Sequence, residues 1–177
     1  NLLFRRKIVY GQRDLNRILD SIKNKQKFVM MTGLMPSGKF HFGHAMVLQQ
    51  VLFYQSIGAK LYITVADIEE YNTRNQDVNE LKKIAIEEYL TNYIALGLST
   101  KNLDFYFQSK RADNGKKSNA YYTLANQVSR HVTFNEVKAL YGDEITPGKL
   151  SSALLQVSDM LHPQLSEFEG PIPVVVP

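Results

Sequence analysis

The sequence contains no cysteine among its 177 residues. Disulfide bonds, thiolate nucleophiles and cysteine-ligated zinc are therefore excluded for this chain. No run approaches the ~20 apolar residues that a membrane-spanning helix needs, so we expect no membrane partner. The first residues, 1–7, turn polar too soon for a secretory signal peptide, and we expect a cytoplasmic protein. Internal repeats and low-complexity runs are also lacking.

The remaining composition is that of one folded domain, with 44% hydrophobic and 21% charged residues. The formal net charge of +4 comes from basic residues that are mostly scattered. Two small clusters stand out, one at residues 5–7 and one between residues 110 and 117. Such a charge is compatible with a nucleic-acid partner and equally with an ordinary basic surface, so charge alone does not decide.

Apolar runs alternate with amphipathic stretches along the chain. Strands are predicted at residues 28–32, 61–66, 104–108 and 173–176, and helices at residues 46–54 and 79–96. This alternation is typical of an α/β fold built on a parallel sheet.

The remaining segments are predicted from local signals. A short amphipathic helix over residues 14–23 places Leu15, Ile18, Leu19 and Ile22 on one face. Residues 110–118 are typical of an exposed loop, residues 121–130 form a helix, and a further helix begins at Thr133. A mostly apolar helix is predicted at residues 154–161.

A turn rich in Gly, Pro and Ser connects the first predicted strand to a helix that opens with two histidines, His41 and His44. Backbone amides at a helix start carry partial positive charge, and glycines such as Gly38 and Gly43 let a ligand approach the backbone. We expect the histidines to share a helix face, with room over Gly43 for a flat ring or ribose. The turn predicts a nucleoside triphosphate site in which the imidazoles donate hydrogen bonds to phosphate oxygens.

The main alternative for such a pair is a metal site or a surface histidine pair. Because the other histidines, His131 and His162, lie far away in sequence and cysteine is absent, we expect no metal held by side chains of this chain.

Polar residues follow each of the next two predicted strands: Asp67, Glu69 and Tyr71 after the second, and Gln108, Ser109 and Lys110 after the third. Parallel sheets bind ligands at the carboxyl ends of their strands, so these positions predict a site at one edge. We expect Asp67 to hold local backbone structure. Glu69 has two interpretations, a solvated loop residue or an acceptor for a substrate amine or ribose.

Residues 28–44 resemble the first signature of class I aminoacyl-tRNA synthetases of the tryptophan/tyrosine subgroup, and most closely tryptophanyl-tRNA synthetases of archaeal type. Residues 65–71, 132–136 and 155–161 continue the resemblance in the right order, so it covers nearly the whole chain. The resemblance implies a Rossmann-like nucleotide-binding domain over residues 28–177, incomplete at its C-terminus, with a helical insertion at roughly residues 112–141. Residues 1–27 are then an N-terminal extension.

The resemblance also implies the site residues. It assigns His41 and His44 to stabilising the pentacoordinate phosphorus of the transition state. It assigns six residues to ATP: Thr32, Gly33, Met35, Ser37, Gly38 and Gly43. It assigns five residues to the amino-acid pocket: Met31, Thr64, Glu69, Gln156 and Asp159.

Within that pocket, the resemblance places Asp159 at the polar atom of the substrate side chain and Gln156 near the α-amino group. An indole N–H only donates, so a carboxylate acceptor would select it. Met31 and Thr64 stand where another tryptophan-specific branch has a tyrosine and a glutamine that contact the indole. Ser152 replaces a tyrosine of tyrosine-type pockets, which disfavours tyrosine as the substrate. The alternative is that Gln156 and Asp159 bond to each other or face solvent.

The implied function is ATP-dependent activation of tryptophan and its transfer to tRNA(Trp) by a homodimer, with Mg²⁺ accompanying the ATP. The alternatives are a tyrosyl-tRNA synthetase, a nucleotidylyltransferase, and a non-catalytic nucleotide- or RNA-binding fragment. The family's ribose-binding loop, second signature loop and anticodon domain are not in these 177 residues, so we expect weak or no activity from the isolated chain.

Overall fold

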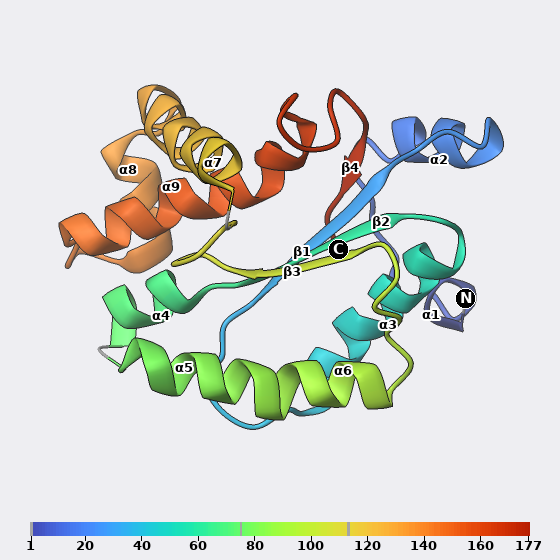
Figure 1. Ribbon diagram of the computed structural model, residues 1–177, viewed down its shortest axis with the longest axis horizontal. Coiled ribbons are helices and arrows are strands. Elements are labelled where there is room, and N and C mark those ends of the chain that lie inside the picture. Colours follow the sequence, from blue (N-terminus) through green and yellow to red (C-terminus); the bar gives the residue numbers. More distant parts are fainter. Residues whose placement is uncertain (1, 75, 113) are drawn as a thin grey trace.

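The computed structural model describes residues 2–74, 76–112 and 114–177. Its centre is a parallel four-stranded sheet in the order β3-β2-β1-β4, formed by β1 (Val29–Leu34), β2 (Lys60–Val65), β3 (Leu103–Phe107) and β4 (Val174–Val175) (Figure 1). The inner strands β1 and β2 are almost wholly buried because helices cover both faces, which explains their continuous apolar sequences. The predicted α/β parallel sheet is confirmed, and its strands lie within two residues of the expected bounds.

One face of the sheet is covered by helix α3 (Phe42–Ser56) and by the long helical segment that runs through α5 (Val78–Ile84) and α6 (Thr91–Ala95) (Figure 1). Between α5 and α6 the segment widens into a π-helical stretch, Ala85–Leu90, that holds the buried Tyr89. Met30, Leu48 and Ile63 belong to the main core on this side. The helix predicted at residues 79–96 is thus present, with a π-helical stretch that periodicity did not indicate.

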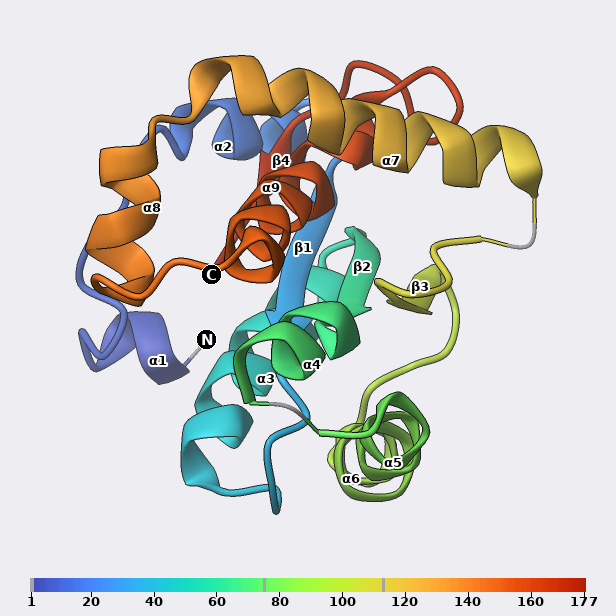
Figure 2. The same cartoon turned by 90° about the vertical axis from the view of Figure 1, so that its left-hand side faces the viewer.

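The opposite face carries α7 (Gly115–Val128), α8 (Phe134–Tyr141) and α9 (Pro147–Leu161). Figure 2 shows α7 crossing above α9, with α9 beside β1 and the α5 and α6 segment on the far side of the sheet. Thr133 and Glu136 form the predicted capping box of α8. The loop predicted at residues 110–118 is partly wrong, since the Asn114 side chain accepts from the Lys116 N–H and starts α7 six residues before the expected position.

The N-terminal segment contains α1 (Leu2–Arg5) and α2 (Asn16–Lys23), and α2 packs onto the main core. Ile18 is buried, and Leu15 and Ile22 pack beside it. Leu19 was predicted on the same face, which is wrong, because it is 51% exposed. Within the described ranges, none of the helices is both long and apolar enough to cross a membrane.

Candidate functional site

A cavity of about 300 Å³ opens at the carboxyl ends of β1 and β2, under α9. This size lies at the lower end of the range for small-molecule sites. Seven of the predicted site residues line the cavity: Met31, Gly33, Met35, Thr64, Glu69, Gln156 and Asp159. Gln108, which was predicted at this edge of the sheet, also lines the cavity. Four further lining residues were not assigned to the site from the sequence: Leu34, Ala66, Met160 and Val176. The structure therefore brings the whole predicted amino-acid pocket together.

Asp159 projects from α9 and is almost completely buried, with 2% of its surface exposed. Its Oδ1 accepts from the hydroxyls of Tyr106 (2.7 Å) and Tyr121 (2.8 Å), and its Oδ2 accepts from Gln108 Nε2 (2.8 Å). Burial raises the pKa of the Asp159 carboxyl to about 6, although these hydrogen bonds favour the ionised form. A carboxylate has about four acceptor sites, so one remains for a donor in the cavity.

Gln108 connects the two ends of the cavity. Its Nε2 donates to Asp159, while its Oε1 accepts from the backbone N–H of Glu69 (3.3 Å). The side chain is fully buried, so both halves of the amide need these partners. Its position after the third strand indicated the correct edge of the sheet. The partnership with Asp159, 51 residues away, had no signal in the sequence.

Glu69 is buried in α4 (Asp67–Arg74), so its interpretation as a solvated loop residue is wrong. Its Oε1 accepts from the Tyr141 hydroxyl (2.9 Å) and its Oε2 accepts from Gln156 Nε2. The alternative that Gln156 and Asp159 bond to each other is also wrong, because each has partners elsewhere. The cavity thus has two carboxylates, Glu69 and Asp159, each fixed by hydrogen bonds.

Asp67 opens α4 and is fully buried. Its carboxylate accepts from the backbone N–H groups of Ile68 (3.1 Å) and Ser109 (3.0 Å), and from the Ser109 hydroxyl. These bonds tie the end of β2 to the residues that follow β3. They agree with the prediction that Asp67 holds local backbone structure, although the segment is a helix and not a loop.

The glycine-rich turn lies between β1 and α3. His41 is the N-cap of α3, and its Nδ1 accepts from the Gly43 N–H (3.1 Å). His44 Nδ1 accepts from the His41 N–H (3.2 Å), and the two rings stack with centroids 3.8 Å apart. Because each Nδ1 is an acceptor, the proton of each neutral ring is on Nε2. Two Nε2–H donors are therefore available at the start of α3.

Partial burial, together with the positive charge of a protonated His41, lowers the pKa of His44. His44 is therefore a neutral donor at neutral pH. The prediction of open space over Gly43 is wrong, since a Cβ there would lie 3.0 Å from Cε1 of His41. The His41 ring occupies that space.

The residues predicted to bind ATP divide into separate groups. Gly33 and Met35 line the cavity, whereas Ser37 and Gly38 are exposed in the turn. Thr32 is buried within β1, and strand alternation directs it to the opposite face from Met31 and Gly33.

Among the residues that the structure describes, no group of three or more His, Cys, Asp or Glu is placed to hold a metal ion.

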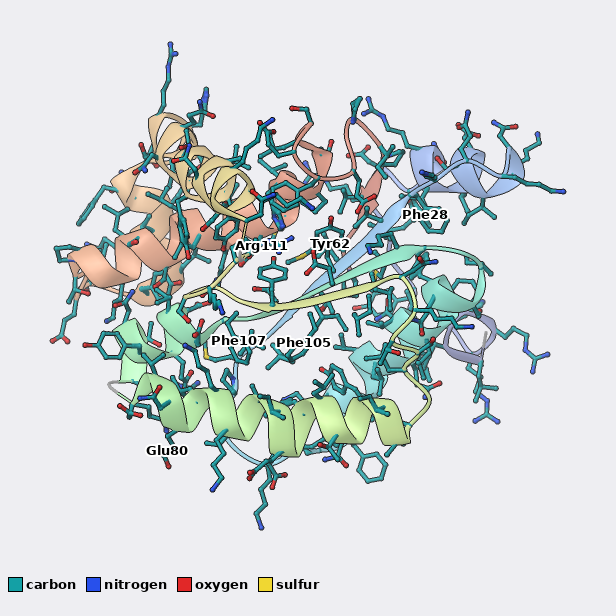
Figure 3. The ribbon with its side chains drawn as sticks, viewed as in Figure 1. Phe28, Tyr62, Glu80, Phe105, Phe107 and Arg111 are labelled. Carbon is teal, nitrogen blue, oxygen red and sulfur yellow. The ribbon has the colours of Figure 1, made fainter. Side chains whose placement is uncertain are left out.

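A buried polar cluster around Arg111 lies behind the cavity on the same face of the sheet. The Arg111 guanidinium lies 3.9 Å from the centre of the Tyr106 ring and forms an ion pair with Asp104 (2.9 Å). Its Nε donates to His162 Nε2 (2.8 Å). Figure 3 shows Arg111 and Tyr62 on this side of β3, with Phe105 and Phe107 on the other. The cluster supports Tyr106, which in turn bonds to Asp159, and nothing in the sequence indicated it.

Comparison with known proteins agrees with this geometry. The family model described as tRNA synthetases class I (W and Y) matches residues 23–168. The chain belongs to this family of class I tRNA synthetases.

Relatives within the family are more specific. The chain is 43% identical over 176 residues to a tryptophan–tRNA ligase of Hyperthermus butylicus, covering 99% of this chain and 45% of the relative. The crystal structure of tryptophanyl-tRNA synthetase from Aeropyrum pernix K1 superposes with a TM-score of 0.90 at 42% identity, covering 99% of this chain and 46% of that one. The chain spans about half the length of these relatives.

The fold extends to a more distant relative. The tyrosyl-tRNA synthetase of Archaeoglobus fulgidus, complexed with L-tyrosine, has a TM-score of 0.69 at 23% identity, covering 84% of this chain and 47% of that one. This likeness concerns the fold alone.

Proposed function

We propose that this chain carries the tryptophan-activating site of a tryptophan–tRNA ligase. In the proposed reaction the carboxylate of tryptophan attacks the α-phosphate of ATP, and tryptophanyl-adenylate and pyrophosphate are formed. A hydroxyl at the 3′ end of tRNA(Trp) then attacks the acyl carbon of the adenylate, and AMP leaves. The observation that carries the proposal is the buried Asp159 carboxylate, an acceptor at the end of a small, largely apolar cavity.

Tryptophan fits the hydrogen-bonding character of this cavity. Tyr106, Gln108 and Tyr121 all donate to Asp159, so the end of the cavity offers an acceptor to the substrate. An indole N–H is a donor only and matches that acceptor. Met31 and Met160 supply an adaptable apolar wall for a flat ring.

Activation needs ATP beside the cavity, and the start of α3 supports this. The exposed Nε2–H of His41 and that of His44 are donors at the positively polarised N-terminus of a helix, an arrangement suited to phosphate oxygens. We propose that they donate more strongly to the pentacoordinate phosphorus than to the ground state. Ser37, Gly38 and Gly43 lie along the same turn, and Gly33 and Met35 join it to the cavity.

Other parts of the proposal follow from the family. Mg²⁺ would enter with the phosphates of ATP and offset their charge. We further propose a cytoplasmic homodimer in which residues 112–141 form the helical insertion, residues 28–177 belong to the catalytic domain and residues 1–27 form an extension. A nucleotidylyltransferase fits less well, because its phosphate-bearing second substrate calls for basic groups, and none of the described residues lining the cavity is Lys or Arg.

The test is ATP–pyrophosphate exchange, measured on a protein that carries this chain at the length of its relatives. We expect exchange to depend on tryptophan and to be about a hundredfold slower with tyrosine, the order of discrimination that the fit of a side chain in an apolar pocket supplies. Exchange that is equal for the two amino acids, or that needs neither, contradicts the proposal.

A further inference from the structure

Tyr141 is hydrogen-bonded to a residue of the cavity wall, Glu69, from an element outside the sheet. It is the last residue of α8, and Gly142 ends that helix with a positive φ of 79°. Its hydroxyl donates to Glu69 Oε1 at 2.9 Å, across 72 residues of sequence. Most of α8 is exposed, including Phe134 and Leu140, so this hydrogen bond is a specific link from the helix to the site.

The carboxylate of Glu69 is held on both oxygens. Tyr141 from α8 bonds to Oε1, and Gln156 from α9 bonds to Oε2. The backbone N–H of Glu69 is also fixed, because it donates to Gln108. These contacts restrict the side chain to one orientation at the cavity wall. Two of its four acceptor sites are in use, and two remain for a ligand.

The chemistry of those remaining sites favours a cation with several donors. Glu69 and Asp159 are the two carboxylates among the described residues that line the cavity. Asp159 keeps about one free acceptor site and Glu69 keeps two. An ammonium group has three N–H donors and a full positive charge, so Glu69 is the better partner for it.

We propose that Tyr141 is a positioning residue that holds Glu69 in place to bind the α-ammonium group of the amino-acid substrate. This inference rests on the proposed function and adds to it a residue of α8. Without the hydroxyl, Glu69 keeps its charge and loses one of the two donors that fix its orientation. The amine is then bound less tightly, while the part of the ligand near Asp159 is unaffected.

The test compares three ligands by calorimetric titration of this chain and its Tyr141→Phe variant. Tryptophan and tryptamine carry the amine, whereas indole-3-propionate lacks it. We expect Tyr141→Phe to weaken the binding of tryptophan and of tryptamine about tenfold, the size of one hydrogen bond to a charged group. The affinity for indole-3-propionate should be unchanged. Tyr10→Phe is the matched control, since Tyr10 is 92% exposed and does not line the cavity.

A second variant tests the route through Glu69. In a Glu69→Gln background, Tyr141→Phe should have no further effect on the amine ligands, because the carboxylate that it positions is gone. If Tyr141→Phe lowers the affinity for all three ligands equally, or for none of them, the role of Tyr141 is overturned. If the unmodified chain, shown to be folded, binds no tryptophan, the proposed function fails and this inference fails with it.

Discussion

At the scale of single residues, the site consists of polar side chains whose buried partners come from distant parts of the chain. Asp159 was predicted as a pocket residue because the family resemblance places it at the polar atom of the substrate side chain. Its donors Tyr106 and Tyr121 were not, because a tyrosine in a strand or a helix is usual in a core and has no pattern that indicates a bond 38 or 53 residues away. The resemblance therefore indicated the acceptor Asp159, whereas residue type and spacing did not indicate the tyrosines that hold it.

The pKa of Asp159, raised to about 6 by burial, predicts a pH-dependent affinity for tryptophan. Protonation removes the charged acceptor, so affinity should be nearly full above about pH 7, half its maximum near pH 6, and fall by up to about tenfold per pH unit below that. Titrations between pH 8 and pH 5 measure this, and Asp159→Asn should bind weakly with little dependence on pH. A wild-type affinity that is constant over the range contradicts Asp159 as the acceptor.

His44 provides the second prediction at this scale. Its Nε2–H is free to donate because Nδ1 is bonded to the His41 N–H. His44→Ala should slow tryptophan-dependent pyrophosphate exchange by about a hundred- to a thousandfold, as expected for the loss of one transition-state donor. His131→Ala, an exposed histidine outside the site, is the control. An unchanged exchange rate in His44→Ala excludes the role.

At the scale of elements, strands were easier to predict than helix starts. Buried parallel strands are continuous apolar runs, and this signal is local. The early start of α7 depends on one capping residue, Asn114, inside a polar stretch that is typical of a loop. For α9, Thr146 and Pro147 were an available signal that was not used, since Pro is favoured at the first position after a capping Thr. Helix α4 was not predicted, because two adjacent acidic residues, Glu69 and Glu70, are typical of a solvated segment when their hydrogen-bonding partners are not known.

The start of α3 gives a prediction about an element. Gly43 lies in the first turn of the helix, and a Cβ there would come within 3.0 Å of the His41 ring. Gly43→Ala should displace that ring and slow pyrophosphate exchange at least tenfold, although alanine favours the helix by about 1 kcal/mol. Gly115→Ala in the first turn of α7 meets open space and is the control for the helix effect. Full activity of Gly43→Ala contradicts the arrangement of the turn.

At the scale of the whole molecule, the sheet separates an apolar core on one face from a polar network on the other. Met30, Leu48 and Ile63 belong to the apolar core, and Arg111 and His162 belong to the polar network. His162 is fully buried, and burial together with the nearby Arg111 guanidinium lowers its pKa to about 3. The strands and the helices of the first face were predicted from apolar runs and amphipathic stretches. The polar network on the other face was not predicted, because charged residues are expected at the surface unless their partners are known.

His162 predicts how stability depends on pH. Its pKa is about 3 in the folded chain and 6.5 when exposed, so the unfolded chain binds a proton first as pH falls. The folded state should lose about 2 kcal/mol from this group between pH 8 and pH 5. Asp159, whose pKa is raised, acts in the opposite direction, so the comparison needs a variant. Urea denaturation of the wild type and of His162→Gln measures this contribution. The difference between their unfolding free energies, wild type minus variant, should fall by about 2 kcal/mol from pH 8 to pH 5. A difference that stays constant contradicts the prediction.

The central claim is that the cavity beside Asp159 is a tryptophan pocket. The most direct measurement is calorimetric titration of this chain with tryptophan and with tyrosine, each with and without a non-hydrolysable ATP analogue. The account predicts that tryptophan binds, that tyrosine binds at least tenfold more weakly, and that the analogue leaves this preference in place. Equal binding of the two amino acids, or binding of neither by a chain shown to be folded, would contradict it.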